Sequence, residues 1–152
     1  KATKFANKCL DVSEFLAKLE PRAPRHPLPY RVAYHDACHL QHAQGISKPP
    51  RTVLASIPKL EICDIPEGGL CCGAAGIYSL VEPETAFELG NRKAKNILTT
   101  GADIVVSSNP GCLLQLRRGL EQAGRDLPIH HLIELVDASI RGETHLERLS
   151  KK

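Results

Sequence analysis

Residues Leu70–Tyr78 read Leu-Cys-Cys-Gly-Ala-Ala-Gly-Ile-Tyr, and the prediction of both fold and function starts from this stretch. A disulfide between the adjacent cysteines Cys71 and Cys72 is disfavoured, because the small ring that it closes strains the peptide between them. Two neighbouring thiols are better explained by a group that binds both. Gly73 and Gly76 let the backbone approach that group closely and turn N–H groups toward it. An iron–sulfur cluster or a zinc ion fits this description.

The composition is that of a folded protein with an ordinary hydrophobic core. The chain has 152 residues, enough for one domain, and 42% of them are hydrophobic. Acidic and basic residues are mixed along the chain and give a net charge of +3, so no surface typical of nucleic-acid binding is expected. No apolar run approaches the ~20 residues of a membrane span. We expect a cytoplasmic protein with no nucleic-acid partner and no membrane span of its own.

The use of cysteine favours a metal site over a set of disulfides. Six cysteines in a secreted chain of this size are typical of a disulfide scaffold, but no secretory signal is visible here. The cysteines also fall at the ends of predicted strands instead of being scattered over loops. A reducing compartment and a metal site are therefore expected.

Strands alternate with helices along the chain, and this order predicts an α/β fold. The expected strands cover residues 30–34, 60–65, 102–106 and 128–130. The expected helices cover residues 12–20, 50–57, 110–123 and 132–140 and the stretch between Pro83 and Gly101. Asp11 and Glu14 form a capping box for the first helix. We expect three layers, with helices on both faces of a short, mostly parallel sheet.

The expected domain organisation has three parts. Residues 1–29 form an N-terminal helix and a Pro-rich linker, residues 30–141 form the cysteine-rich domain, and residues 142–152 form a charged tail. Because the chain begins at Lys1 and contains no methionine, we expect it to be the end of a longer protein.

Four cysteines follow three different predicted strands. Cys38 follows the first, Cys71 and Cys72 follow the second, and Cys112 follows the third. Because the carboxyl ends of parallel strands meet at one edge of a sheet, these four thiols are predicted to converge there. Sulfurs that share one small cluster lie within about 8 Å of one another. Asn109 is expected to cap the helix that carries Cys112, so that the helix dipole stabilises the thiolate.

Histidines flank Cys38, and imidazole either binds metal or relays a proton. The favoured interpretation is that His35, His39 and His42 contact the metal ligands and do not bind the metal themselves. Of the three, His39 is expected nearest to the site because it adjoins Cys38.

The other polar residues and cysteines that stand out in the sequence are expected to have structural roles. Cys63 is expected in the core and Cys9 as a free thiol, Asp36 and Arg51 are expected in structural ion pairs or turns, and the basic residues over 92–95 are expected on a solvated helix face.

Four blocks of the sequence together resemble a known family. They are Tyr34-His-Asp-Ala-Cys-His39, Pro50-Arg51, Cys71-Cys-Gly-Ala-Ala-Gly-Ile-Tyr78 and Asn109-Pro-Gly-Cys112. In this order they are similar to the cysteine-rich CCG domain, which occurs in heterodisulfide reductase and in related electron-transfer subunits. The resemblance covers about residues 9–140 and is greatest to the C-terminal part of glycolate oxidase iron–sulfur subunits.

The resemblance implies an iron–sulfur site with Cys38, Cys71, Cys72 and Cys112 as ligands and Gly73 beside them. The heterodisulfide reductase version has a fifth cysteine three residues after the fourth, and Gln115 stands at that position here. Its five-cysteine cluster therefore does not carry over. A four-cysteine 4Fe-4S cluster, a zinc ion and a labile site all remain open, with His39 and His35 near the ligands.

The resemblance also implies partners. In such complexes a flavin-containing subunit oxidises a 2-hydroxy acid, and the iron–sulfur subunit passes electrons toward a membrane or quinone acceptor. The chain lacks ferredoxin-type cysteine runs and has one CCG block, so it corresponds to the second repeat of such a subunit and is not expected to oxidise substrate alone. A location peripheral to the inner membrane follows from such a complex.

Two other hypotheses remain for the function of the chain. One is a zinc-stabilised docking module, and the other is a thiol–disulfide redox domain that uses Cys71 and Cys72.

Overall fold

Within residues 1–144 and 146, which the computed structural model describes, four parallel strands form one sheet in the order β2-β1-β3-β4. The strands are β1 (Arg31–His35), β2 (Glu61–Cys63), β3 (Ile104–Ser107) and β4 (Ile129–His131). In the registers of β1 with its two neighbours, Ala33 lies opposite Cys63 and Val105. The α/β prediction is confirmed, and the sheet is parallel throughout.

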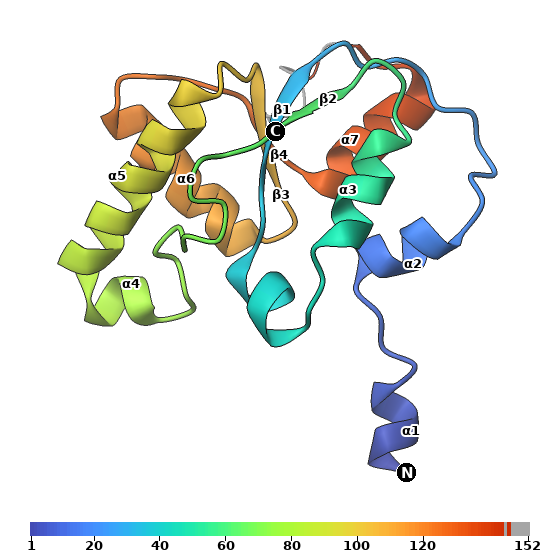
Figure 1. Cartoon of the computed structure of the whole chain (residues 1–152), viewed down its shortest axis with the longest axis horizontal. Helices are drawn as coiled ribbons and strands as arrows, with labels where there is room; N and C mark the ends of the chain where they lie inside the picture. Colours follow the sequence, from blue (N-terminus) through green and yellow to red (C-terminus); the bar gives the residue numbers. More distant parts are fainter. Residues whose placement is uncertain (145, 147–152) are drawn as a thin grey trace.

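Helices cover both faces of the sheet (Figure 1). The longer pair on one face is α5 (Pro83–Thr99) and α6 (Pro110–Gln122), which pack against each other. The other face carries α3 (Lys48–Ala55) and α7 (Leu132–Arg141), with α2 (Val12–Lys18) packed on α3. The three expected layers are therefore present.

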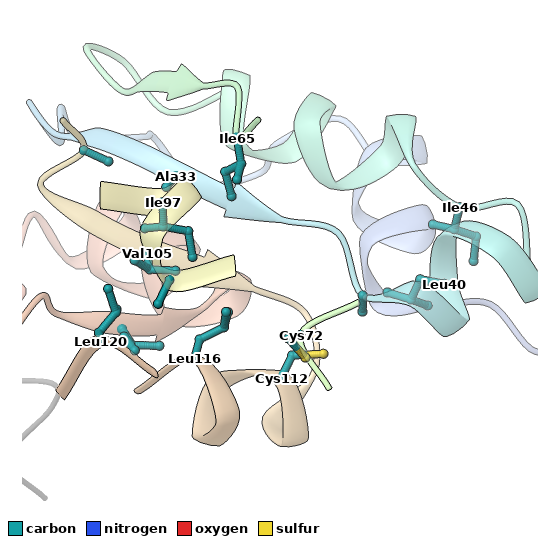
Figure 2. Packing of buried hydrophobic residues seen from close by; sticks show 14 residues of the cluster. Ala33, Leu40, Ile46, Ile65, Cys72, Ile97, Val105, Cys112, Leu116 and Leu120 are labelled. Atoms are coloured by element: carbon teal, nitrogen blue, oxygen red, sulfur yellow. The ribbon is translucent and has the colours of Figure 1, made fainter. Parts of the chain in front are cut away.

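Alternation along the strands separates two hydrophobic clusters. Ala33 and Val105 point to the α5–α6 side, whereas Val32 and Ile104 point to the α3–α7 side. Cys72 and Cys112 belong to the first cluster, and Figure 2 shows their side chains together, with Leu116 on one side and Leu40 on the other. The buried half of the site is thus part of a packed core.

Local signals placed most of the elements correctly. The capping box is formed as expected: Asp11 accepts from the Ser13 amide, and Glu14 accepts from the Asp11 amide. Three short elements were missed, namely α1 (Ala2–Ala6), the π-helix η1 (His39–Ala43) and α4 (Tyr78–Val81). Segments of four or five residues are too short to show a helical period.

The ends of the chain add two observations. Most of the charged tail expected over 142–152 falls on residues 145 and 147–152, outside the described residues. Across the described part of the chain, no helix combines the length and the apolar character that crossing a membrane requires.

Helices α5 and α6 cross closely because glycines meet at the crossing. A Cβ atom added to Gly119 would lie 2.9 Å from the Gly90 carbonyl oxygen and 3.1 Å from the Ala94 Cβ. The Gln115 side chain of α6 also donates a 2.9 Å hydrogen bond to the Ala86 carbonyl of α5. These contacts hold α6, which carries Cys112 in its first turn, against α5.

Gly73 fixes the position of the loop between β2 and α4, which carries Cys71 and Cys72. Its φ is +87°, and an added Cβ would lie 2.4 Å from the Ala86 carbonyl oxygen. Gly76 also has a positive φ, of +62°, but an added Cβ there would meet no described atom within 4 Å. The two glycines of the motif therefore differ: Gly73 is required by both conformation and space, and Gly76 by conformation alone.

This difference gives a matched pair of variants. We expect Gly73→Ala to lower the free energy of unfolding by about 3 kcal/mol, because the methyl group combines left-handed strain with a backbone clash. Gly76→Ala carries only the strain and is expected to cost about 1 kcal/mol. Urea denaturation followed by circular dichroism measures both. Equal losses for the two variants would show that the contact with α5 is unimportant.

Candidate metal centre

The carboxyl edge of the sheet gathers the four predicted cysteines. Cys38 lies three residues beyond the end of β1, and Cys71 and Cys72 lie in the loop between β2 and α4. Cys112 occupies the first turn of α6, which follows β3. The Asn109 side chain caps this helix as predicted, accepting a 3.0 Å hydrogen bond from the Cys112 amide. Three separate strand ends therefore supply the thiols.

The four thiols form two close pairs. The Sγ atoms of Cys38 and Cys71 are 4.0 Å apart, and both side chains are partly exposed. Cys72 and Cys112 are buried, and their sulfurs lie within 4.8 Å of each other. The backbone N–H of Gly73 points at the Cys71 sulfur, 3.3 Å away. The separation within each pair is well inside the 8 Å expected for ligands of one cluster.

Burial and mutual proximity hold Cys38, Cys71 and Cys72 in the protonated form when no cation is bound. The hydrogen bond with Cys112 is the largest influence that raises the pKa of Cys72 to about 11. The hydrogen bond with Cys72, followed by burial, raises the pKa of Cys71. Burial is the largest cause that raises the pKa of Cys38, and the neighbouring Cys71 thiol is the next. A metal cation removes this obstacle, since it binds thiolates directly.

A histidine joins the buried pair. A ring nitrogen of His35 lies within 4.8 Å of the sulfurs of Cys72 and Cys112. Burial lowers the pKa of His35 to about 4, with the nearby positive charge of Lys93 as a second cause, so the ring is neutral at pH 7 and keeps a lone pair. Among the described residues, neither ring nitrogen of His35 has a hydrogen-bond partner, and the buried hydroxyl of Ser107 has none either.

These observations test whether the site fits a metal group. Ser107 lies opposite His35 in the β1–β3 register, so the two side chains share one face of the sheet. Buried polar atoms are nearly always satisfied in folded proteins, and unsatisfied ones call for an explanation. Thiols with a neutral imidazole are also the donors that zinc and iron–sulfur clusters take. The donor set therefore fits the expected group.

This group of donors does not include His39, His42, Cys9 or Cys63. His39 is exposed at the start of η1, so burial favours His35, contrary to the ranking from the sequence. His42 is also exposed, Cys9 is exposed beyond α1, and Cys63 is a partly buried residue of β2. The signal for His35 was present in the sequence: extending the first strand by one residue places it on the same face as Ala33, which points to the α5–α6 side.

An ion pair anchors the segment between β1 and Cys38. The Arg51 guanidinium donates to both carboxylate oxygens of Asp36, at 2.7 and 2.6 Å, and stacks 5.2 Å from the centroid of the Tyr34 ring. Asp36 is buried, and this pairing satisfies its charge. Both residues thus have the structural roles expected of them.

Lys93 corrects the expectation that residues 92–95 form a solvated face. Its side chain is fully buried, and its ammonium donates to the carbonyls of Glu67 and Gly68, at 2.8 and 3.3 Å. Burial lowers the pKa of Lys93, while the nearby Cys72, Glu67 and other acidic groups raise it. Lys93 lies two turns after the buried Ala86 on α5, so helical spacing placed it on the buried stripe. Its residue type alone suggested exposure.

Lys93 is expected to hold the loop that leads to the cysteines. Lys93→Met keeps the aliphatic stem but removes the ammonium group. The Gly68 carbonyl then loses its hydrogen-bond donor and the Glu67 carbonyl loses one of its two donors, so the free energy of unfolding should fall by about 1–3 kcal/mol. Lys95→Met, on the exposed side of the same helix, should change it by no more than about 0.5 kcal/mol. Chemical denaturation of both variants measures the difference. Indistinguishable stabilities would contradict the role given to Lys93.

Comparison with known proteins identifies relatives over most of the chain. One subunit of the fumarate reductase (CoM/CoB) of Methanothermobacter marburgensis is 40% identical over 129 residues, which cover 84% of this chain and 26% of that protein. The probable glycolate oxidase iron–sulfur subunit of Bacillus subtilis is 35% identical, covering 90% of this chain and 32% of that protein. Lactate utilization protein A 1 of Bacillus mycoides is 27% identical, covering 90% of this chain and 56% of that protein.

The chain thus spans between about a quarter and somewhat more than half of the length of these relatives. The family model of the CCG cysteine-rich domain matches residues 32–117, a segment that contains all four thiols of the site and His35. Because this match covers more than half of the chain, the protein belongs to the CCG cysteine-rich domain family.

Proposed function

We propose that the chain is an electron-transfer module in which Cys38, Cys71, Cys72 and Cys112 hold an iron–sulfur cluster of the 4Fe-4S type. The main support is the convergence of two close thiol pairs at one sheet edge, beside buried polar atoms that lack partners among the described residues. The description of the Bacillus subtilis relative as an iron–sulfur subunit supports the same proposal.

An iron–sulfur cluster supplies reversible one-electron chemistry when it is bound. The residues of this chain bind it and set its surroundings. The buried pair Cys72 and Cys112 lies away from water, and the Gly73 N–H is available to sulfur, an interaction that tunes reduction potential. The positive charge of Lys93 lies near Cys71 and Cys72 and offsets the negative charge of their thiolates.

The partners follow from the relatives. We propose that the module accepts electrons from a flavin-containing subunit that oxidises a 2-hydroxy acid, and passes them toward a membrane or quinone acceptor. The names of the relatives, glycolate oxidase and lactate utilization, support this substrate class. The partly exposed pair Cys38 and Cys71 is the side of the site from which a docked partner exchanges electrons. The module is cytoplasmic in this proposal, peripheral to the inner membrane through its complex, and oxidises no substrate alone.

A zinc-stabilised docking module is the second candidate. Its support is the buried group of His35, Cys72 and Cys112, because two thiolates and an imidazole are typical ligands of zinc. The thiol–disulfide alternative is disfavoured. That chemistry requires a thiolate at neutral pH, and the pKa values of Cys71 and Cys72 are both raised.

Anaerobic reconstitution with iron and sulfide tests the proposal. We expect several irons and sulfides per chain and an EPR signal that appears on reduction and disappears on reoxidation. Cys72→Ser should lose most of the bound iron and the signal, because it removes a buried ligand. Cys63→Ser is the matched control, since Cys63 lies in β2 outside the cluster of thiols, and it should retain both.

The other outcomes are equally informative. One tightly held zinc ion with no reducible signal would overturn the electron-transfer role and support the docking module. A cluster that survives Cys72→Ser unchanged would overturn the proposed ligand set.

A further inference from the structure

His35 is a fully formed donor that the four-cysteine ligand set leaves unused. It is 1% exposed, and neither Nδ1 nor Nε2 has a hydrogen-bond partner among the described residues. A neutral histidine placed in a core for packing alone normally makes a hydrogen bond through at least one ring nitrogen, because an unsatisfied buried polar atom is destabilising. The position of His35 therefore calls for a partner.

The fold directs this imidazole at the buried cysteines. His35 is the last residue of β1, Cys72 belongs to the loop held by Gly73 against α5, and Cys112 starts α6. Their ligand atoms all lie within 4.8 Å of one another. Three separate segments thus place one nitrogen and two sulfurs around a common point.

The neighbouring polar residues do not take this place. The Gln115 side chain, one turn after Cys112, donates to the Ala86 carbonyl, and Asp36, next to His35, is held by Arg51. Lys93 donates to the carbonyls of Glu67 and Gly68. Each of these groups has a partner elsewhere. On this face of the sheet, His35 and the Ser107 hydroxyl are the described groups that lack one, and of the two the imidazole is the usual metal ligand and lies within 4.8 Å of both sulfurs.

We propose that His35 is itself a ligand, binding the metal group through a ring nitrogen beside the sulfurs of Cys72 and Cys112. The site then has mixed nitrogen and sulfur donors, with Cys38 and Cys71 completing it on the more exposed side. This inference rests on the proposed function only in requiring that the site binds metal. A neutral imidazole brings one negative charge less than a thiolate, and histidine ligands raise the reduction potential of an iron–sulfur centre relative to cysteine.

Nitrogen labelling tests the proposal without altering the fold. Protein grown with ¹⁵N-histidine is reconstituted with iron and sulfide, reduced and examined by pulsed EPR. We expect the hyperfine coupling of a directly bound histidine nitrogen in the unaltered protein and its loss in His35→Gln. His130→Gln is the matched control, because His130 is also 1% exposed and both of its ring nitrogens lack hydrogen bonds among the described residues, but it lies beside Glu134 of α7.

The results separate this inference from the proposed function. A reducible cluster with no histidine coupling, or a coupling that survives His35→Gln, would overturn the role of His35 and leave the electron-transfer proposal standing. A coupling lost in His39→Gln instead would also overturn it. Circular dichroism of each variant establishes that it is folded.

Zinc provides the second readout where no reducible cluster forms. X-ray absorption of the zinc-loaded protein should then show nitrogen and sulfur around the metal, with the nitrogen lost in His35→Gln. That result would support His35 as a ligand and overturn the electron-transfer role. A shell of sulfur alone, or failure to retain either metal, would overturn the proposal for His35.

Discussion

Burying several thiols side by side is the constraint on which this structure depends. Cys72 and Cys112 lie in the hydrophobic core, with Cys71 and Cys38 beside them, and the pKa values of Cys38, Cys71 and Cys72 are all raised. Hydrogen bonding and burial together raise the pKa of Cys72 to about 11. Such a cluster adds little to the stability of a core, and its arrangement is explained when a cation converts the thiols to thiolates.

The backbone around the site serves that arrangement. Gly73 admits the cysteine loop close to α5, and the crossing of Gly90 with Gly119 brings α6 close to the same helix. Lys93 then fixes the start of the loop by binding two carbonyls. Each contact is made between backbone and small groups, so the positions of Cys72 and Cys112 depend on features that tolerate little change. The site is therefore built into the packing of α5 and α6 and is not an addition to the surface.

The sequence was sufficient for the parts of the fold that repeat or that carry a local signal. The alternation of strands and helices predicted the parallel sheet, and Asn109 was identified as the cap of the helix that holds Cys112. The placement of four cysteines after three strands predicted their convergence, because parallel strands end at one edge. These inferences need only the period of each element and the topology.

Side-chain burial was harder to predict where residue type and position disagree. Lys93 lies on the buried stripe of α5, but lysine is rarely buried. The two carbonyls that accept its hydrogen bonds belong to a loop about 25 residues earlier in the chain. Adjacency to Cys38 in the sequence favours His39, whereas the alternation of side chains along β1 points His35 to the side of the sheet that holds the buried cysteines. The pairing of Cys38 with Cys71, and of Cys72 with Cys112, depends on how the loops pack and has no local signal.

In the proposed function, the thiols from three strand ends surround one metal group. Crystals of the anaerobically reconstituted protein, measured at the iron absorption edge, test this arrangement, because anomalous scattering locates the metal itself. We predict one iron cluster at the carboxyl edge of the sheet, bonded to the sulfurs of Cys38, Cys71, Cys72 and Cys112. Iron bound elsewhere, or bound to Cys38 and Cys71 with Cys72 and Cys112 left as free thiols, would contradict it.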